Sequence, residues 1–288
     1  MVTFFMGKIL VVGANGFIGG EVLSYFGERA IGISNIVSKE KNILKVDITK
    51  KEELEMFFEE NDISSCVDFA GVSLSRVCEE NKALAYQVNV LGQKNLLNVC
   101  SKQGVDYYYS STVRLYDSDI GEVDENSEIK KSNCYTETKI LAEKQIKEFF
   151  KEGKLKKAVI FRFSNTFGKD PNKERLIPTI ISALKNGSIE LTNANTKFDL
   201  LYVRDIPKAI ELAMRNANGF GIFNVASGEQ LTMKEIAQRI SRKLQNNSKV
   251  IIKDENELLH PKISIGKIAS LGFVPTKFEK AFDEIFDF

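Results

Sequence analysis

Histidine is almost absent from this sequence, and neither a charge excess nor a long apolar run stands out. His260 is the single histidine, so catalytic triads built on histidine and most zinc sites lack the residues they need. The 40 basic and 39 acidic residues nearly cancel, which leaves no electrostatic footprint for a nucleic acid or a membrane surface. No apolar run approaches the ~20 residues that cross a bilayer. We therefore expect no metal, nucleic acid or membrane among the partners, and a small molecule as the ligand.

Cysteine is also scarce. The four cysteines are widely and irregularly spaced, which matches neither a zinc pattern nor a dense disulfide framework, so we expect free thiols. Residues 1–8 lack the anatomy of a signal peptide. Together these features predict a cytoplasmic location.

Short apolar runs alternate with helical patterns over the first 165 residues. The runs expected to be strands are Lys8–Val12, Ala30–Ile33, Ser65–Ala70, Val105–Tyr109 and Lys157–Phe161. The patterns expected to be helices are Glu52–Glu60, Asn81–Cys100 and Tyr135–Phe150. This alternation predicts an α/β fold with a Rossmann-like, doubly wound parallel sheet.

The regular alternation of predicted strands and helices changes after Phe163. Helical patterns and extended runs still follow one another, but the mononucleotide-binding pattern stops. We predict an NAD(P)-binding domain over residues 1–165 and a smaller substrate-binding region over residues 166–288. A later strand near 222–226 is expected to return to the sheet.

Three glycines follow the first predicted strand and open a helix. Gly13, Gly16 and Gly19 occur in the strand–turn–helix context that a dinucleotide requires, because glycine lets the backbone approach a pyrophosphate at a helix N-terminus. The spacing is three and three, rather than the two and three of the commonest fingerprint.

A tyrosine and a lysine stand one helical turn apart, downstream of a run of hydroxyl residues. In a helix Tyr135 and Lys139 share a face, so the Lys139 ammonium is expected near the phenol and would move its pKa toward neutrality. Thr112 could then hold a carbonyl oxygen beside the phenol. Chance alone gives about one such pair in a lysine-rich chain with eight tyrosines. The pair is therefore evidence for a catalytic site only together with other motifs.

Several motifs in order resemble the extended short-chain dehydrogenase/reductases, which include nucleotide-sugar epimerases, dehydratases and 4-ketoreductases. The motifs are Gly13-x-x-Gly16-x-x-Gly19, Ser110-Ser111-Thr112, Tyr135-x-x-x-Lys139, Asn89 to Leu97, Arg162 to Gly168 and Asp199 to Asp205. The stretch from Val72 to Leu97 is most similar to the dTDP-4-dehydrorhamnose reductase branch, whereas Phe198 to Asp205 looks like the epimerase/dehydratase pattern.

The resemblance implies a role for each matched position. It implies Thr112, Tyr135 and Lys139 as catalytic residues. The residues expected to bind the cofactor are Gly13, Asn15, Gly16, Phe17, Ile18, Gly19, Ser34, Lys39, Asp47, Ile48, Phe69, Ala70, Gly71, Asn89, Ser110, Tyr135, Lys139 and Phe163. The residues expected to bind substrate, a nucleotide-diphosphate sugar, are Ser73, Thr112, Asn165 and Tyr202.

Departures from the family pattern narrow the chemistry. Dehydratases of the family carry an Asp-Glu pair directly after the catalytic threonine, whereas this chain has Val113-Arg114, which disfavours dehydration. The second strand ends on Ser34 without an acid, with Lys39 and Lys41 nearby, so NADP(H) is favoured and NAD(H) is the alternative. The alternative is that Lys39 and Lys41 lie in a solvated loop and do not contact the cofactor.

A diphosphate also needs cations. The arginine that the family often places in the late extended segment is Phe198 here, and Lys197, Arg175 or Arg204 could replace it.

Three functions remain open. The first is an NADPH-dependent 4-ketoreductase, an oxidoreductase with Tyr135 as general acid that acts on a keto nucleotide sugar, expected to be of the 4-keto-6-deoxy type. The second is an NAD-dependent nucleotide-sugar 4-epimerase. The third is a catalytically idle, cofactor-binding regulatory subunit, against which the presence of Thr112, Tyr135 and Lys139 argues. Apolar residues beyond one face of the helices at Asn81–Cys100 and Tyr135–Phe150 predict a homodimer.

Overall fold

The structure is a computed structural model that describes residues 7–40, 42–117, 121–169, 174–245 and 247–286. Two segments used above lie outside the described residues. They are Lys41, which was cited for the NADP(H) preference, and residues 1–6, which were cited for the missing signal peptide. Among the described helices, none has the length and apolar character needed to cross a membrane.

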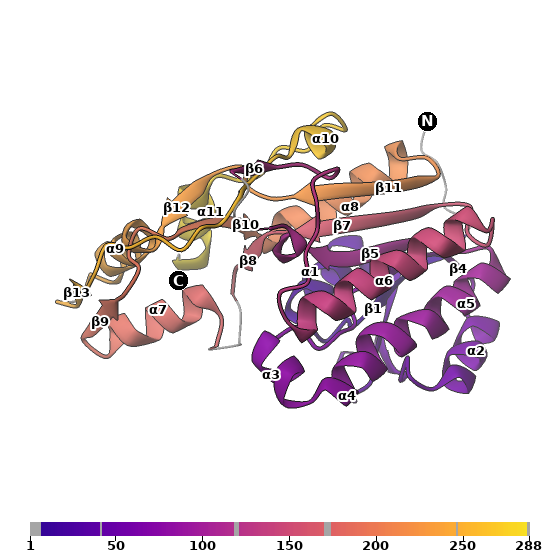
Figure 1. Ribbon diagram of the computed structural model, residues 1–288. Coiled ribbons are helices and arrows are strands. Elements are labelled where there is room, and N and C mark those ends of the chain that lie inside the picture. Colours follow the sequence, from indigo (N-terminus) through magenta and orange to yellow (C-terminus); the bar gives the residue numbers. More distant parts are fainter. Residues whose placement is uncertain (1–6, 41, 118–120, 170–173, 246, 287–288) are drawn as a thin grey trace.

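A seven-stranded parallel sheet forms the centre of the larger lobe (Figure 1). Its order is β11-β7-β5-β4-β1-β2-β3. The bounds are β1 Lys8–Val12, β2 Ala30–Ser34, β3 Ile43–Lys45, β4 Ile63–Asp68, β5 Asp106–Thr112, β7 Ala158–Phe163 and β11 Phe220–Val225. The order reverses direction at β1, so β1 and β4 flank a topological switch point, where such sheets bind ligands.

Helices cover both faces of this sheet. Alternate residues of β1 belong to different apolar clusters, because side chains of a strand alternate between faces. Ile9 and Val11 pack with α1 and α8, and Leu10 and Val12 pack with α2, α5 and α6. The bounds are α1 Phe17–Phe26, α2 Lys51–Glu60, α5 Gln93–Gln103, α6 Cys134–Lys151 and α8 Ile206–Asn216. The doubly wound Rossmann-like fold predicted from the sequence is confirmed.

The helix predicted over Asn81–Cys100 is confirmed, but it is not a regular α-helix along its whole length. The structure divides this stretch into α4 (Lys82–Tyr86), a π-helical segment (Gln87–Gly92) and α5. A Cβ atom on Gly92 would lie 2.8 Å from the side chain of Ile48, so any larger residue would have to displace Ile48 in the loop after β3. Hydrophobic periodicity does not reveal such a local widening.

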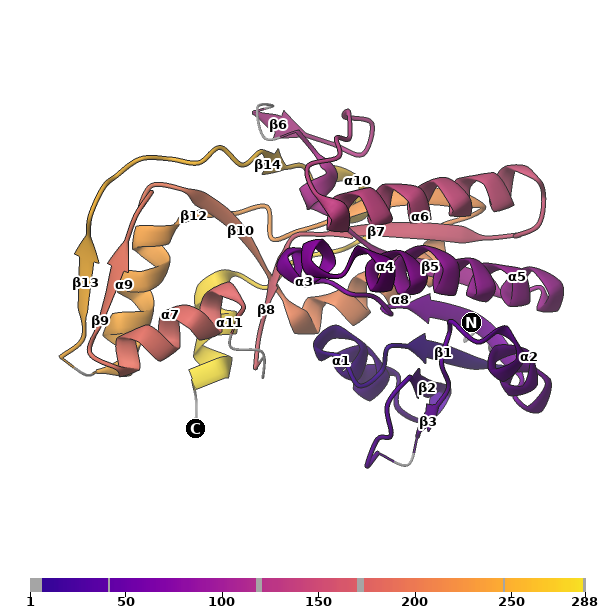
Figure 2. The ribbon, with the colours of Figure 1, turned by 60° about the horizontal axis from the view of Figure 1, so that its bottom comes forward.

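The smaller lobe is built from later segments of the chain (Figure 2). Its sheets pair β8 (Asn165–Phe167), β10 (Lys197–Tyr202) and β12 (Gln230–Thr232), and separately β9 (Ser188–Leu191) with β13 (Lys249–Ile252). Its helices are α7 (Leu176–Lys185), α9 (Met233–Leu244) and α11 (Phe278–Phe286). These elements share an apolar cluster of their own.

The chain does not stay in the smaller lobe once it has entered it. After β10 it returns through α8 and β11, and β11 pairs in parallel with β7 at the edge of the central sheet. The remaining short elements are α3 (Ser75–Glu80), β6 (Glu122–Val123), β14 (Lys262–Ile263) and α10 (Gly266–Ala269). β14 pairs with β6, so a late segment also crosses back over the larger lobe.

Candidate active site

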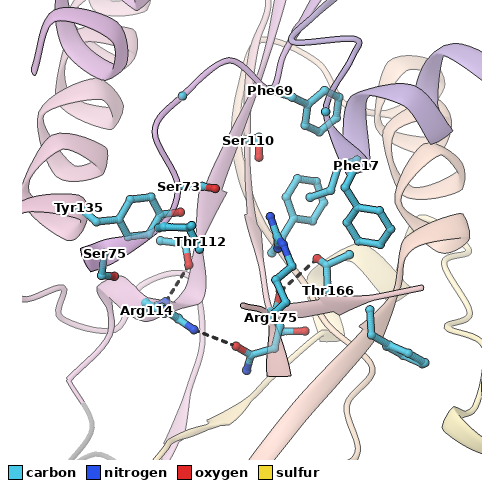
Figure 3. Close-up of a pocket in the computed structure, with 18 of the residues that line it drawn as sticks. Phe17, Phe69, Ser73, Ser75, Ser110, Thr112, Arg114, Tyr135, Thr166 and Arg175 are labelled. Carbon is cyan, nitrogen blue, oxygen red and sulfur yellow. Dashed lines mark hydrogen bonds between the residues drawn. The ribbon is translucent and has the colours of Figure 1, made fainter. Parts of the chain in front are cut away.

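A cavity of about 400 Å³ lies where the carboxyl ends of β1, β4 and β5 meet the smaller lobe (Figure 3). Most of its lining residues come from the glycine turn, the loop after β4, the end of β5 with α6, and the segment from the end of β7 to α7, and Leu200 on β10 also lines it. Expected site residues found there are Gly13, Gly16, Phe17, Ile18, Gly19, Phe69, Gly71, Ser73, Ser110, Thr112, Tyr135, Lys139, Phe163 and Asn165.

The glycine turn leaves no room for side chains. A Cβ atom on Gly19 would lie 2.3 Å from the carbonyl oxygen of Gly13, and one on Gly13 would lie 3.0 Å from the backbone of Phe69 and Ala70. Gly13 also has φ of +76°, a left-handed conformation that other residues rarely adopt. The backbone at the start of α1 is therefore open to a ligand, which fits the pyrophosphate of a dinucleotide.

Other expected cofactor residues are not among those that line this cavity. Ser34 is buried at the end of β2, and its hydroxyl accepts a hydrogen bond from the backbone of Ile36 (3.4 Å). The Asp47 carboxylate accepts hydrogen bonds from the backbone and hydroxyl of Thr49 (2.9 and 2.8 Å). Asn15, Lys39, Ile48 and Ala70 are likewise not among the residues that line it. Their roles stay predictions.

Asn89 has a different environment from the one expected for a cofactor contact. Its buried amide accepts a hydrogen bond from the Val72 backbone N–H (2.7 Å) and donates to the Val72 carbonyl and the Thr138 hydroxyl (both 3.0 Å). Asn89 thus fastens the loop after β4 to α6.

Tyr135 lies in the first turn of α6, with its ring beside Thr112 (Figure 3). Asn133 fixes the start of this helix, because its side chain accepts a hydrogen bond from the Thr136 backbone (3.0 Å). Burial raises the pKa of Tyr135, while the charges of Arg114 and Arg175 and a hydrogen bond with Thr112 lower it.

Lys139 does not act on Tyr135 in the way the spacing suggests. Its ammonium donates hydrogen bonds to the Ser110 carbonyl (2.7 Å) and to the Tyr109 hydroxyl (3.1 Å). Burial lowers the pKa of Lys139 to about 8, and the charge of Asp68 opposes that shift. The expected movement of the Tyr135 pKa toward neutrality is therefore wrong for this structure, since burial outweighs the cations.

Arg114 is one of the two residues that stand where dehydratases of the family carry their Asp-Glu pair. Its backbone N–H donates to the Thr112 hydroxyl (3.2 Å), and its guanidinium donates to the Asn165 side chain (3.3 Å). Within the described part of the chain, Glu174 is the one carboxylate that lines this cavity, and it is exposed and paired with Arg76.

The expected substrate residues divide into two groups. Ser73, Thr112 and Asn165 line the cavity. Tyr202 is not among the lining residues: it is buried against Phe167, and its hydroxyl donates to Glu284 (2.9 Å).

The cations named above as replacements for the arginine missing at Phe198 lie in different places. Arg175 lines the cavity, with its guanidinium 5.7 Å from the centre of the Phe17 ring. Arg204 instead pairs with Glu21 and Glu284. Ser75, Thr166 and the start of α7 line the cavity although they were not named as site residues. Ser75 and Thr166 lie inside stretches that resemble the family, whereas no motif marks the start of α7.

A second cavity, of about 630 Å³, adjoins the first and shares Val113, Arg114, Ser164 and Asn165 with it. Lys197 lines it and pairs with Glu257. The rings of Phe198 and His260 lie 5.3 Å apart on its wall. Burial and the charge of Arg114 lower the pKa of His260, which favours the neutral ring.

Behind the site, a buried ion pair joins α6 to the sheet. Arg162 donates to Glu143 at 2.7 and 3.1 Å, and Glu143 also accepts from the Ser111 hydroxyl (2.6 Å). Tyr116 accepts from Arg162 (2.9 Å) and donates to Asn224 (2.7 Å), which carries the network to β11. These bonds fix the end of β5 against α6, and so position Thr112 relative to Tyr135.

All four cysteines are free and buried. No group of three histidine, cysteine, aspartate or glutamate side chains is placed to hold a metal ion among the residues that the structure describes.

A model of the NAD-dependent epimerase/dehydratase family matches residues 9–226. The chain belongs to this family. It is an NAD(P)-dependent oxidoreductase of the extended short-chain dehydrogenase/reductase type, as the motifs predicted. The family match spans the glycine turn, Thr112, Tyr135 and Lys139.

The chain is similar to one curated relative by sequence and to two solved structures by fold. The chain is 31% identical to a sterol-4-alpha-carboxylate 3-dehydrogenase of Schizosaccharomyces pombe, over 82% of this chain and 74% of the relative. The UDP-glucose 4-epimerase of Thermus thermophilus, solved in complex with NAD, has a TM-score of 0.85 at 23% identity and covers 97% of this chain and 98% of its own. The UDP-glucose 4-epimerase of Thermotoga maritima, solved with UDP-glucose, has a TM-score of 0.87 at 21% identity, with 97% of each chain covered.

Proposed function

We propose that this enzyme is an NADPH-dependent 4-ketoreductase of a keto nucleotide sugar. The observation that carries the proposal is the pair of hydroxyls from Thr112 and Tyr135 in the cavity, with Val113 and Arg114 beside them instead of carboxylates. Dehydration needs a further acid and base at the sugar, whereas reduction of a ketone needs one proton donor.

The residues fit a simple reduction. NADPH, when bound, supplies the hydride for the keto carbon. The Thr112 hydroxyl holds the keto oxygen beside the Tyr135 phenol, and Tyr135 donates its proton to that oxygen, giving the hydroxyl of the product. The raised pKa of Tyr135 keeps the phenol protonated before the reaction, as a general acid requires.

Lys139 would act on the cofactor rather than on the tyrosine. Its side chain reaches the end of β5 through Ser110 and lines the cavity on the cofactor side. We infer that it orients the nicotinamide ribose.

The preference for NADPH is supported by the end of β2. Ser34 stands where an acid would repel a 2′-phosphate, and Lys39 is exposed nearby. The substrate's distal part would enter the second cavity, where Phe198 and His260 offer ring faces for stacking with a base. Arg175 is our choice for the diphosphate.

A second candidate is an NAD-dependent nucleotide-sugar 4-epimerase. It is favoured by the two UDP-glucose 4-epimerases that share the fold over almost the whole chain. The same Thr112 and Tyr135 would serve both reactions, since epimerisation also moves a proton and a hydride at one carbon.

The fate of the cofactor separates the candidates. We expect the purified enzyme to oxidise NADPH stoichiometrically with a keto nucleotide sugar, followed by absorbance and by mass spectrometry of the product. If the enzyme instead carries tightly bound NAD, consumes none of it and inverts the configuration at C4 of the sugar, the ketoreductase hypothesis is rejected in favour of the epimerase. Binding of NADPH without turnover of a broad panel of keto sugars would instead indicate an idle, regulatory subunit.

A further inference from the structure

Arg114 is the one charged side chain that lines both cavities, among the residues that the structure describes. It follows Thr112 by two residues, in a short 3-10 turn at the end of β5, and lies beside Thr112 in the first cavity (Figure 3). After burial, the charge of Arg114 is the next influence on the pKa of both Tyr135, in the first cavity, and His260, in the second, and it acts downward on each. Arg114 is therefore placed at the junction of the two cavities.

Two hydrogen bonds hold Arg114 at this junction. Its backbone N–H donates to the Thr112 hydroxyl (3.2 Å), and its guanidinium donates to the Asn165 side chain on β8 (3.3 Å). A guanidinium carries several N–H donors in a planar fork, so one bond to a neutral amide leaves most of them for a ligand. Arg114 is exposed, which makes these donors accessible from the cavities.

The other cations that line the second cavity already have carboxylate partners. Lys130 pairs with Asp117 (3.1 Å), Lys131 with Glu137 (2.6 Å) and Lys197 with Glu257 (3.2 Å). Arg114, by contrast, forms no ion pair with any residue in the described part of the chain. A cation without a counter-ion, at the meeting point of two cavities, is a place where a ligand can put a negative charge.

We propose that Arg114 binds a carboxylate on the sugar ring of the substrate, so that the enzyme acts on an acidic keto sugar. The inference rests on the proposed function of the same site, in which Thr112 and Tyr135 receive the keto oxygen. Since Arg114 is on the same short turn as Thr112, the anion that it binds belongs to the ring that carries the keto group rather than to the nucleotide. A sugar acid then takes the place of the 4-keto-6-deoxy sugar, whose ring has no anion for Arg114.

The charges around Arg114 favour a carboxylate over a phosphate. One guanidinium balances the single charge of a carboxylate, and its planar fork matches the two carboxylate oxygens. Asp199 on β10 also lines the second cavity, and its ionised form would repel an anion there. That form is stabilised by three donors: the Ser164 hydroxyl (2.6 Å) and the backbone N–H groups of Ser227 and Gly228 (both 2.8 Å). Because each further charge on the ligand adds to this repulsion, a group with one negative charge fits better than a phosphate with two.

The test is calorimetric binding of three probes to the enzyme in the presence of NADP⁺: UDP-glucuronic acid, UDP-glucose and UDP. The two sugars differ only at C6, which is a carboxylate in the first and a hydroxymethyl group in the second. We expect the wild type to bind UDP-glucuronic acid most tightly. R114M should weaken that binding about 10- to 100-fold, because a hydrogen bond between charged groups is lost, and should leave UDP-glucose and UDP within about 2-fold.

Further variants separate the charge from the fold. R114K keeps the charge without the planar fork, and it should recover part of the affinity for UDP-glucuronic acid. R215M is the matched control, because Arg215 is exposed on α8, pairs with Glu211 and is not among the residues that line either cavity. It should bind all three probes like the wild type. R114Q keeps a hydrogen-bond donor without the charge, and it replaces R114M if that variant does not fold by circular dichroism.

Three outcomes would overturn the proposal. The first is unchanged binding of UDP-glucuronic acid in R114M. The second is an equal loss for UDP-glucose, and a loss for UDP as well would move the contact to the diphosphate. The third is a wild type that does not bind UDP-glucuronic acid.

An assay of NADPH oxidation with keto sugars distinguishes this proposal from the proposed function. A preference for the carboxylate that R114M abolishes, in a protein that reduces no keto sugar, would reject the ketoreductase and leave the role of Arg114 standing. Reduction of a neutral keto sugar by a protein without any preference for UDP-glucuronic acid would do the reverse.

Discussion

The two sides of the cavity are built by different means. The cofactor side is mainly backbone, in which Gly13 and Gly19 bring β1, α1 and the loop after β4 into contact. The substrate side consists of side chains, chiefly Arg114, Asn165 and Arg175, carried by short elements.

The difference between the two sides indicates that substrate specificity can change more easily than cofactor binding. We call the turn from Gly13 to Gly19 the backbone cradle. It permits few substitutions, because an added side-chain atom meets another stretch of main chain. Side chains on short segments can be exchanged one at a time without moving the sheet.

The largest expected effect comes from the proton donor that lies between the two sides. Tyr135→Phe should lower turnover by roughly 10²- to 10⁴-fold, because the phenol proton is removed while the ring remains. Cofactor affinity, measured by fluorescence titration, should stay near the wild-type value. Tyr25→Phe is the control, since Tyr25 is partly exposed and bonds to Glu211. Near-normal turnover of Tyr135→Phe would remove Tyr135 from the mechanism.

The sequence allowed much of the cofactor side to be predicted because its signals are local. The run Lys8–Val12 is β1 residue for residue, and the glycines that follow line the cavity. Tyr135 and Lys139 also share a helix face, as their spacing requires.

The substrate side could not be read in the same way because it depends on long-range contacts. The contact of Arg114 with Asn165 joins residues 51 positions apart. Tyr202 looked like a substrate residue, yet its hydroxyl is directed to Glu284, which lies 82 positions later on α11. The direction of the Lys139 ammonium likewise depends on β5, and the i, i+4 spacing alone does not specify it.

Lys139 provides the second test, because its charge is buried on the cofactor side. Its pKa is lowered from the usual value to about 8, so the unfolded chain binds more protons than the folded one between about pH 8 and pH 10.5. The wild type should therefore gain stability as pH rises through this window, by roughly 3 kcal/mol. In Lys139→Met this rise should disappear. Thermal unfolding at several pH values measures it, and the same slope in both proteins would contradict the buried cation.

Gly19→Ala probes the backbone cradle itself. The new Cβ would clash with the Gly13 carbonyl, and overpacking of this kind costs about 1–3 kcal/mol. We expect a lower melting temperature and weaker cofactor binding by calorimetry. Gly20→Ala is a matched control one residue along the same helix, because its Cβ would lie 3.4 Å from the nearest atom, an ordinary contact. Equal losses in the two variants would show that the cradle tolerates side chains.

Tyr202→Phe should have the smallest effect and tests the boundary of the substrate side. The variant loses the hydrogen bond to Glu284 but keeps the ring against Phe167, so unfolding should become easier by about 0.5–1.5 kcal/mol. Turnover and KM should not change. Asn165→Ala, by contrast, removes a side chain that lines the cavity and should raise KM about 2- to 10-fold. If Tyr202→Phe raised KM as much as Asn165→Ala does, the substrate side would extend along β10 as far as Tyr202, and the Tyr202 hydroxyl would have to leave Glu284 when substrate binds.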